Sequence, residues 1–257
     1  MIINTCVNYV FWNIYMFMID KYIIPHGGAI LGITVGIVVP VYRFIVFEII
    51  YGRREYISER EVKQRVSWSN MYLIIRIQTV VSLAIMSYFI APTSMDYRFI
   101  HVRDIIKSVI SFYTTDAFFY ISHRSMHNRL VYTFLGHKEH HKLIKPTSHV
   151  SSETFTFSDG STHLIVFWLS YSLLKHCFDF DNFLFILTFS QWVIVGQMQH
   201  GGKDIIDLDS IPFLEYSRQI FVKESMCMLH DRHHSLFNKN YSMTGIPDKL
   251  LNTKSMY

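Results

Sequence analysis

Long apolar runs separated by short polar connections dominate the first half of the chain. A helix needs roughly 20 residues to cross the hydrocarbon layer of a bilayer. Four runs approach this length: residues 2–24, 29–50, 71–91 and 105–121. A later pair, residues 164–174 and 183–198, is shorter. The pattern predicts an all-α integral membrane bundle with four or more crossings, followed by a helical hairpin that enters the membrane without crossing it fully.

Charge is unevenly distributed between the connections. Residues 51–70 carry five basic side chains, whereas the turn around residues 20–28 carries only Lys21. Basic connections favour the cytosolic side of a membrane. Two further crossings then return the chain to the cytosol just before His123, and the hairpin returns it there before His200. We therefore predict N-terminal membrane helices in residues 1–104 and a catalytic domain in residues 105–257, whose histidine-rich cap faces the cytosol.

The composition supports a membrane location. Half of the residues are hydrophobic and 17% are charged, against roughly 25% charged residues in soluble domains. The net charge of +4 suits basic connections beside a membrane better than a nucleic-acid interface. The odd number of cysteines, without a CxxC pair, argues against a disulfide framework and indicates reduced thiols. The first run has no cleavage site after it, so we expect a retained helix rather than a signal peptide.

Eight of the fourteen histidines lie in three short segments, residues 123–127 (HRSMH), 137–141 (HKEHH) and 230–234 (HDRHH). On a helix, residues at i, i+3 and i+4 share one face, so each segment directs its imidazoles toward one point. Imidazole is a common ligand of first-row transition metals, and eight are too many for one tetrahedral zinc ion. A lone pair of histidines could instead be polar residues at a membrane interface. Three segments on one side favour two metal ions, held by His123, His127, His137, His140, His141, His230, His233 and His234.

One carboxylate shares the helical stripe of the first segment. Asp116, Tyr120, His123 and His127 are spaced as i, i+4, i+7 and i+11. We predict that Asp116 accepts a hydrogen bond from the second ring nitrogen of a ligating imidazole and so orients that ring. The alternative is a carboxylate at a helix end, exposed at the membrane interface.

These segments and their surroundings resemble the sterol desaturase and fatty acid hydroxylase superfamily, whose members are membrane di-iron oxidases of lipids. Residues 116–124 (DAFFYISHR) are similar to the family's approach to its first histidine box. Residues 146–147 (Pro-Thr) follow the second box as they do in the family. Residues 240–241 and 248–253 are similar to the family's ending. The resemblance extends over residues 116–253.

The resemblance implies one further histidine ligand. It also shows one position where the family's usual histidine is absent. His200 stands where the family usually has a further histidine, so we expect it as a ninth ligand. Thr156 stands where the family often has a histidine after its second box. Glu153, His149 or His163 could replace that histidine, and we place Glu153 beside the ligands.

An oxidoreductase follows from the resemblance: two non-haem iron ions, with dioxygen as co-substrate, desaturating or hydroxylating a lipid. Residues 129–132, together with the second box, are most similar to sterol ring-B desaturases, so a sterol is the expected substrate. The sequence carries no flavin, nicotinamide or haem motif. We therefore expect the electrons to come from a separate b-type cytochrome with its NAD(P)H reductase, in the endoplasmic reticulum membrane. No nucleic-acid partner is expected.

Other functions remain open from the sequence. Within the superfamily, the chain could be a sterol methyl or side-chain oxidase, or a fatty-acyl hydroxylase. From a different class, it could be a metal-binding membrane protein without catalysis, such as a transporter. A transporter needs ligands near the middle of the membrane, on interrupted helices. The three segments here follow helix ends on one side, which favours the enzyme.

Overall fold

Helices account for all the regular structure in the part of the chain that the computed structural model describes. That part comprises residues 2–44, 77, 80–81, 83–85, 87–141, 157–200 and 214–255. The elements are α1 (Ile2–Met18), η1 (Ile19–Ile23), η2 (Ile24–His26), α2 (Gly28–Phe44), α4 (Val102–Met126), α5 (Arg129–Phe134), α6 (His137–His140), α7 (Phe157–Cys177), α8 (Asn182–Met198), α9 (Leu214–Gln219), α10 (Met226–Leu236) and α11 (Ile246–Leu250). The all-α prediction is confirmed for the described residues.

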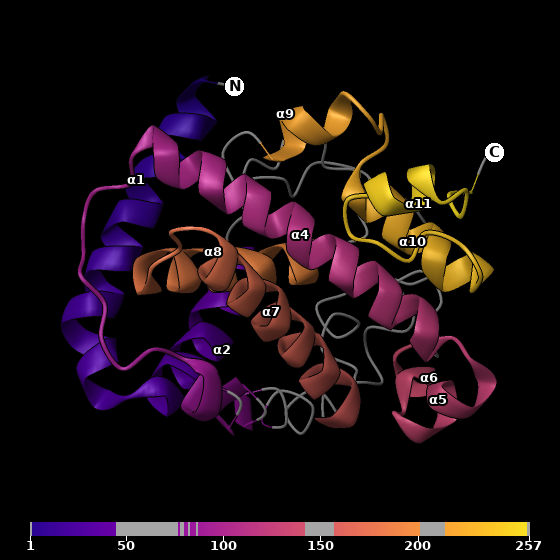
Figure 1. Cartoon of the computed structure of the whole chain (residues 1–257), viewed down its shortest axis with the longest axis horizontal. Helices are drawn as coiled ribbons and strands as arrows, with labels where there is room; N and C mark the ends of the chain where they lie inside the picture. The colour runs from indigo at the N-terminus through magenta and orange to yellow at the C-terminus, as the bar shows by residue number, and fades with distance from the viewer. Residues whose placement is uncertain are drawn as a thin grey trace.

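Helix α4 runs through the middle of the molecule, with α1 and α2 toward one end and α5, α6, α10 and α11 toward the other (Figure 1). Asp104 caps its first turn, because one carboxylate oxygen accepts the backbone N–H of His101 at 3.0 Å. The other oxygen pairs with Arg98 at 2.9 Å. These contacts fix the start of a helix whose other end carries His123 and His127.

The predicted hairpin is present as α7 and α8. The chain turns between them at residues 178–181, and Asp181 caps α8 by accepting the N–H of Leu184 at 2.9 Å. Helix α7 begins at Phe157, earlier than the apolar run that starts at residue 164. The additional first turns carry polar residues, which is why a hydrophobicity pattern does not include them.

Aromatic side chains join the central helices into one core. Phe112 and Phe119 of α4 lie 5.1 and 5.5 Å from the ring of Trp192 in α8, centroid to centroid. All three are almost fully buried. The N-terminal helices share this core, since Tyr15 of α1 lies 3.0 Å from the hydroxyl of Ser190 in α8. Packing along the length of α4 therefore fixes the position of its last turn.

Two glycines allow α2 to approach the segment around residues 83–91 very closely. A Cβ atom on Gly28 would lie 2.2 Å from the carbonyl oxygen of Ser87, and one on Gly32 would lie 2.2 Å from that of Leu83. The spacing of four residues places both glycines on one face of α2. Small residues at this spacing are typical of close helix contacts in membrane proteins.

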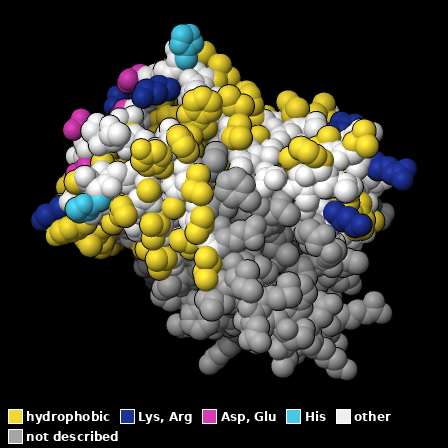
Figure 2. Space-filling view, turned by 90° about the horizontal axis from the view of Figure 1, so that it is seen from below, with side chains coloured by type: hydrophobic (Ala, Val, Ile, Leu, Met, Phe, Trp, Pro, Cys, Tyr) yellow, Lys and Arg dark blue, Asp and Glu magenta, His cyan; other side chains and the backbone are white. Residues whose placement is uncertain are grey.

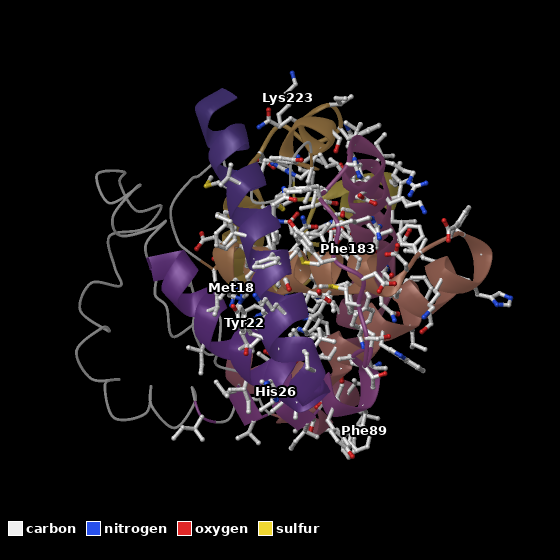
Figure 3. The ribbon with its side chains drawn as sticks, turned by 90° about the vertical axis from the view of Figure 1, so that its left-hand side faces the viewer. Met18, Tyr22, His26, Phe89, Phe183 and Lys223 are labelled. Carbon is white, nitrogen blue, oxygen red and sulfur yellow. The ribbon has the colours of Figure 1, made fainter. Side chains whose placement is uncertain are left out.

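Many large hydrophobic side chains are exposed, and Figure 2 shows them gathered over part of one face. Met18, Tyr22 and His26 follow one another along α1 and the turn after it, with Phe89 at the same end of the molecule (Figure 3). The exposed hydrophobic residues on these and neighbouring elements include Val10, Ile14, Phe17, Met18, Tyr22, Ile77, Val81, Ile85, Tyr88, Phe89, Ile106, Ile110, Ile165, Leu169 and Leu173. We call this set the exposed apolar residues.

No described helix is both long enough and apolar enough to span a bilayer. The run at residues 105–121 belongs to α4, whose inner side buries Ser108, Ser111 and Asp116 against other helices. The basic connection at residues 51–70 and much of the run at 71–91 lie outside the described residues.

Candidate metal centre

Nine histidines converge where the end of α4 meets α6, α10 and the residues after α8. They form two groups, and within each group the potential ligand atoms lie within 4.8 Å of one another. The five-histidine cluster consists of His123, His127, His137, His141 and His233, and the four-histidine cluster consists of His140, His200, His230 and His234. These are the nine residues that the sequence singled out as ligands, and the structure brings all of them together.

Helical geometry divides the second and third segments between the two clusters. Successive residues of an α-helix are about 100° apart, so i+4 lies about 40° from i in one direction and i+3 about 60° from i in the other. The directions of i+3 and i+4 therefore differ by about 100°. His137 and His141 accordingly join the five-histidine cluster, and His140 joins the other. In α10 the assignment is reversed, because the i, i+4 pair of this segment belongs to the four-histidine cluster and His233 belongs to the five-histidine cluster.

Hydrogen bonds to the second ring nitrogen orient four of the imidazoles. His123 Nδ1 donates to the carbonyl oxygen of Tyr241 at 2.6 Å, and His233 Nδ1 donates to that of Lys239 at 2.7 Å. His200 Nδ1 donates to the carbonyl oxygen of Gly196 at 2.7 Å. His137 Nδ1 donates to Asp159, with 3.1 Å between nitrogen and oxygen. With the proton held at Nδ1, each ring presents an unprotonated Nε2 to its cluster.

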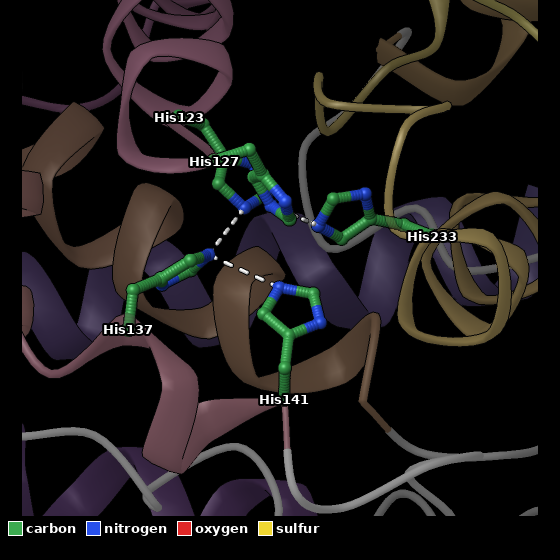
Figure 4. Close-up of side chains that lie close together, drawn as sticks. All are labelled: His123, His127, His137, His141 and His233. Atoms are coloured by element: carbon green, nitrogen blue, oxygen red, sulfur yellow. Dashed lines mark hydrogen bonds between the residues drawn. The ribbon is translucent and has the colours of Figure 1, made fainter. Parts of the chain in front are cut away.

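These Nε2 atoms approach one another as ligand atoms around a cation do. His137 Nε2 lies 3.1 Å from the Nε2 atoms of both His123 and His141, and those of His127 and His233 are 3.2 Å apart (Figure 4). Metal–imidazole bonds of about 2.0–2.1 Å separate neighbouring ligand nitrogens by roughly 2.9–3.4 Å. Since His123 and His137 both direct a lone pair into their contact, they cannot hydrogen-bond to each other there. A metal ion satisfies both lone pairs.

The Nε2 atoms of the four-histidine cluster are also close together. His200 Nε2 lies 2.7 Å from that of His230 and 3.3 Å from that of His140. His234 Nε2 lies 2.9 Å from that of His230. All four side chains are buried except for a small part of their surface. The donor set of each cluster therefore fits a first-row transition metal.

Burial keeps the imidazoles neutral. It lowers the pKa of His127 and of His137 to about 4, because its effect exceeds the raising effect of Asp159, and neighbouring imidazoles lower the pKa further. The pKa values of His123, His230 and His233 are lowered well below the usual value, first by burial and then by adjacent imidazoles. Neutral imidazole is the form that binds metal, so at pH 7 protons do not compete for these nitrogens.

Asp159 is a functional residue that the sequence reasoning missed. Its side chain is fully buried in the first turn of α7 beside His137 and is 3.6 Å from His163 Nε2. Burial alone would raise the pKa of Asp159, but the hydrogen bond from His137 and the nearby imidazoles outweigh it and hold the pKa at about 2. The i, i+4 spacing of Asp159 and His163 could have indicated this residue, because it places both on one helical face just before the apolar run.

The contact predicted for Asp116 is wrong. Its carboxylate accepts the backbone N–H groups of Met243 and Thr244, at 2.7 and 3.2 Å, and the Thr244 hydroxyl, rather than an imidazole. The exposed alternative is wrong as well, since Asp116 is fully buried. Asp116 and His123 do lie on one stripe of the helix, as predicted. Two turns of helix nevertheless separate them by roughly 10 Å along the helix axis. Asp116 consequently reaches a different part of the surrounding structure.

The replacements considered for Thr156 are only partly within the described residues. His163 is described, but it belongs to neither cluster. Glu153, His149 and Thr156 lie outside the described residues, so their placement beside the ligands stays a prediction.

Two adjacent clusters built from imidazoles alone, in the described part of an all-helical chain, are compatible with a metal centre. The family model described as fatty acid hydroxylase matches residues 108–253. The chain belongs to the fatty acid hydroxylase family, which confirms the superfamily indicated by the histidine segments. The matched region contains all nine histidines of the two clusters.

Two curated proteins are similar to the chain. Delta(7)-sterol 5(6)-desaturase ERG3A of Gibberella zeae is 32% identical over 127 residues, which cover 49% of this chain and 31% of that protein. Fatty acid hydroxylase ahd1 of Mycosarcoma maydis is 25% identical over 142 residues, which cover 55% of this chain and 32% of that protein. The match thus spans about a third of the length of each relative. No solved structure matches the chain.

Proposed function

We propose that the chain is a membrane-associated di-iron oxidoreductase that uses dioxygen to desaturate or hydroxylate a lipid, with a sterol as substrate. The observation that carries this proposal is the pair of adjacent clusters. The rings of His141 and His234, one from each cluster, lie 4.6 Å apart at 29° to each other. Two metal ions held this close together can act on one substrate.

Iron supplies the redox chemistry that no side chain provides. The residues of this chain hold and orient it. Backbone carbonyls and Asp159 keep the proton of four imidazoles on Nδ1, so that each Nε2 is free to bind. Burial of the clusters excludes bulk water from the reaction. Phe119, whose ring lies 4.9 Å from that of His123, brings an apolar surface up to the five-histidine cluster.

A lipid substrate is supported by two observations. The exposed apolar residues on α1, α4, α7 and residues 77–89 are numerous and suit contact with hydrocarbon chains. Both curated relatives have names that refer to lipids, one to a sterol and one to a fatty acid. A membrane location, with the histidine clusters toward the cytosol at the endoplasmic reticulum, would give the enzyme access to a substrate dissolved in the bilayer.

The stoichiometry requires an electron donor. Hydroxylation of a C–H bond by dioxygen consumes two electrons and two protons and releases one water. Desaturation consumes the same two electrons and two protons and releases two waters. We propose that a separate b-type cytochrome and its NAD(P)H reductase supply these electrons.

The test is product analysis with defined lipids. The iron-loaded chain in vesicles is incubated with a Δ7-sterol or a long-chain fatty acyl lipid, a cytochrome, its reductase, NAD(P)H and oxygen. Mass spectrometry should detect an oxygen-dependent sterol product with two hydrogens fewer or one oxygen more. A His140→Ala variant controls for activity that does not depend on the metal. An oxidised fatty acyl product alone would favour the fatty-acyl hydroxylase, and no product from a chain holding two irons would contradict the proposal.

A further inference from the structure

Two buried carboxylates from different helices hold one short stretch of backbone. Asp248 of α11 accepts the N–H groups of Tyr241 and Ser242, at 2.8 and 2.7 Å. Asp116 of α4 accepts those of the next two residues, Met243 and Thr244. Four consecutive N–H groups therefore donate to two carboxylates, and both carboxylates are fully buried. Burial raises the pKa of Asp116 to about 7, against the opposing effect of the hydrogen bonds from Thr244 and Met243.

The same stretch orients two ligands of the five-histidine cluster. The carbonyl oxygens of Lys239 and Tyr241 accept the Nδ1–H groups of His233 and His123. Asn240 lies between them with a positive φ of 56°, and its side chain exchanges hydrogen bonds with Ser255 at 2.9 and 3.0 Å. Asparagine tolerates this left-handed conformation better than most residues. The ring positions of two ligands thus depend on where the backbone of residues 239–244 is held.

The four-histidine cluster is oriented from elsewhere. His200 donates to the carbonyl oxygen of Gly196, four residues earlier in the same chain segment at the end of α8. Neither Asp116 nor Asp248 belongs to the hydrogen bonds that connect the rings of this cluster. In the described part of the chain, the hydrogen bonds that orient the rings therefore come from different segments for the two clusters.

We propose that Asp116 and Asp248 are positioning residues that act, through residues 239–244, on the metal affinity of the five-histidine cluster alone. The inference rests on the proposed function, because it assumes that the clusters bind metal. It assigns Asp116 a role at the metal centre without a direct contact to an imidazole. Removing the support leaves the ligands in place but frees the rings of His123 and His233 to turn.

Metal titration tests this selectively. The purified chain is loaded with cobalt(II), and its metal content and visible absorption are followed against increasing chelator. Asp116→Asn should lower the cobalt affinity of the five-histidine cluster by about 10–100-fold and leave the four-histidine cluster unchanged. At a suitable chelator concentration the variant then retains one ion where the wild type retains two. His127→Ala and His230→Ala, each lacking a ligand of one cluster, provide reference spectra that identify the ion lost.

Asp104→Asn is the matched control, because Asp104 is equally buried in α4 but pairs with Arg98 at the far end of the helix. It should lower the melting temperature and retain both ions. Thr244→Val removes the hydrogen bonds of the hydroxyl with Asp116 and with the backbone N–H of Ile246. It serves if Asp116→Asn does not fold, and it should weaken the same cluster by a smaller factor. Parallel loss of both ions, or wild-type affinity at both clusters, overturns the inference. A wild-type chain that binds no cobalt overturns the proposed function itself.

Discussion

His137 and Asp159 form a hydrogen-bonded pair in which neither side chain has any exposed surface. The Nδ1 of His137 and a carboxylate oxygen of Asp159 are 3.1 Å apart. The pair joins the short helix α6 to the first turn of α7. It gives one ligand of the five-histidine cluster a charged acceptor, where His123 and His233 have neutral carbonyl groups. A carboxylate acceptor raises the basicity of an imidazole ligand more than a carbonyl does.

Asp159→Ala should therefore weaken metal binding or turnover by about 10–100-fold, and Asp159→Asn should do so by less because the amide oxygen still accepts from Nδ1. Metal content and product formation measure the effect. His163→Gln is the matched control, since His163 is close to Asp159 but outside both clusters. Equal losses in Asp159→Ala and His163→Gln would argue against the role assigned to the carboxylate.

His140 and His141 are neighbours in sequence but belong to different clusters. Alanine at either position should leave about one metal ion per chain, and the remaining ion should be a different one in each variant. Activity should fall by at least about 100-fold in both, because each metal is needed for the reaction. Elemental analysis with cobalt(II) spectra distinguishes the two. Identical spectra of the two variants would contradict the division of the histidines.

The stability of the metal-free chain should depend on pH. The pKa values of His127 and His137 are about 4 in the folded chain and near the ordinary value of about 6.5 when unfolded. Between these values the unfolded chain binds more protons, so the free energy of unfolding falls as pH decreases from about 6.5 toward 4. Each such imidazole contributes up to about 1.4 kcal/mol per pH unit. Thermal unfolding at pH 7.5 and 5 checks this, with a shallower dependence expected for His127→Gln.

Gly32→Ala should destabilise the contact between α2 and the segment near residue 83. The new Cβ would lie 2.2 Å from the carbonyl oxygen of Leu83, so the backbone must move. Overpacking of this kind costs about 1–3 kcal/mol. Gly36→Ala is the comparison, because its nearest neighbour at 3.1 Å is the end of the Val80 side chain. A melting temperature unchanged by Gly32→Ala, or lowered equally by both substitutions, would contradict the close approach.

The histidine clusters were predictable because their signal is local. A spacing of three and four residues is a property of one helix, and three such segments indicate a shared metal site before any tertiary contact is known. The partners of the second ring nitrogens were not predictable in this way. Asp159 precedes the apolar run of α7, and the carbonyl groups of Lys239 and Tyr241 have no side-chain signature at all.

The hydrophobicity of an apolar run does not show which surface covers it. The run at residues 105–121 is long and largely apolar, yet Ser108, Ser111 and Asp116 lie on the buried side of α4. A hydrophobicity pattern records the amount of apolar surface and not what covers it. Asp116 was expected near the metals for a sound reason, its helical face. Only the packing of residues 243–244 shows what that face contacts.

The reversed assignment of the second and third histidine segments would fix the distance between two metal ions bound to the clusters. Each of these two segments contributes to both clusters. The helical turns of α6 and α10 therefore act as rigid spacers, and neither cluster can move away from the other unless a helix unwinds. In many di-iron bundles, carboxylates that change their mode of binding absorb changes in the metal pair. Imidazoles on fixed helical positions lack that freedom.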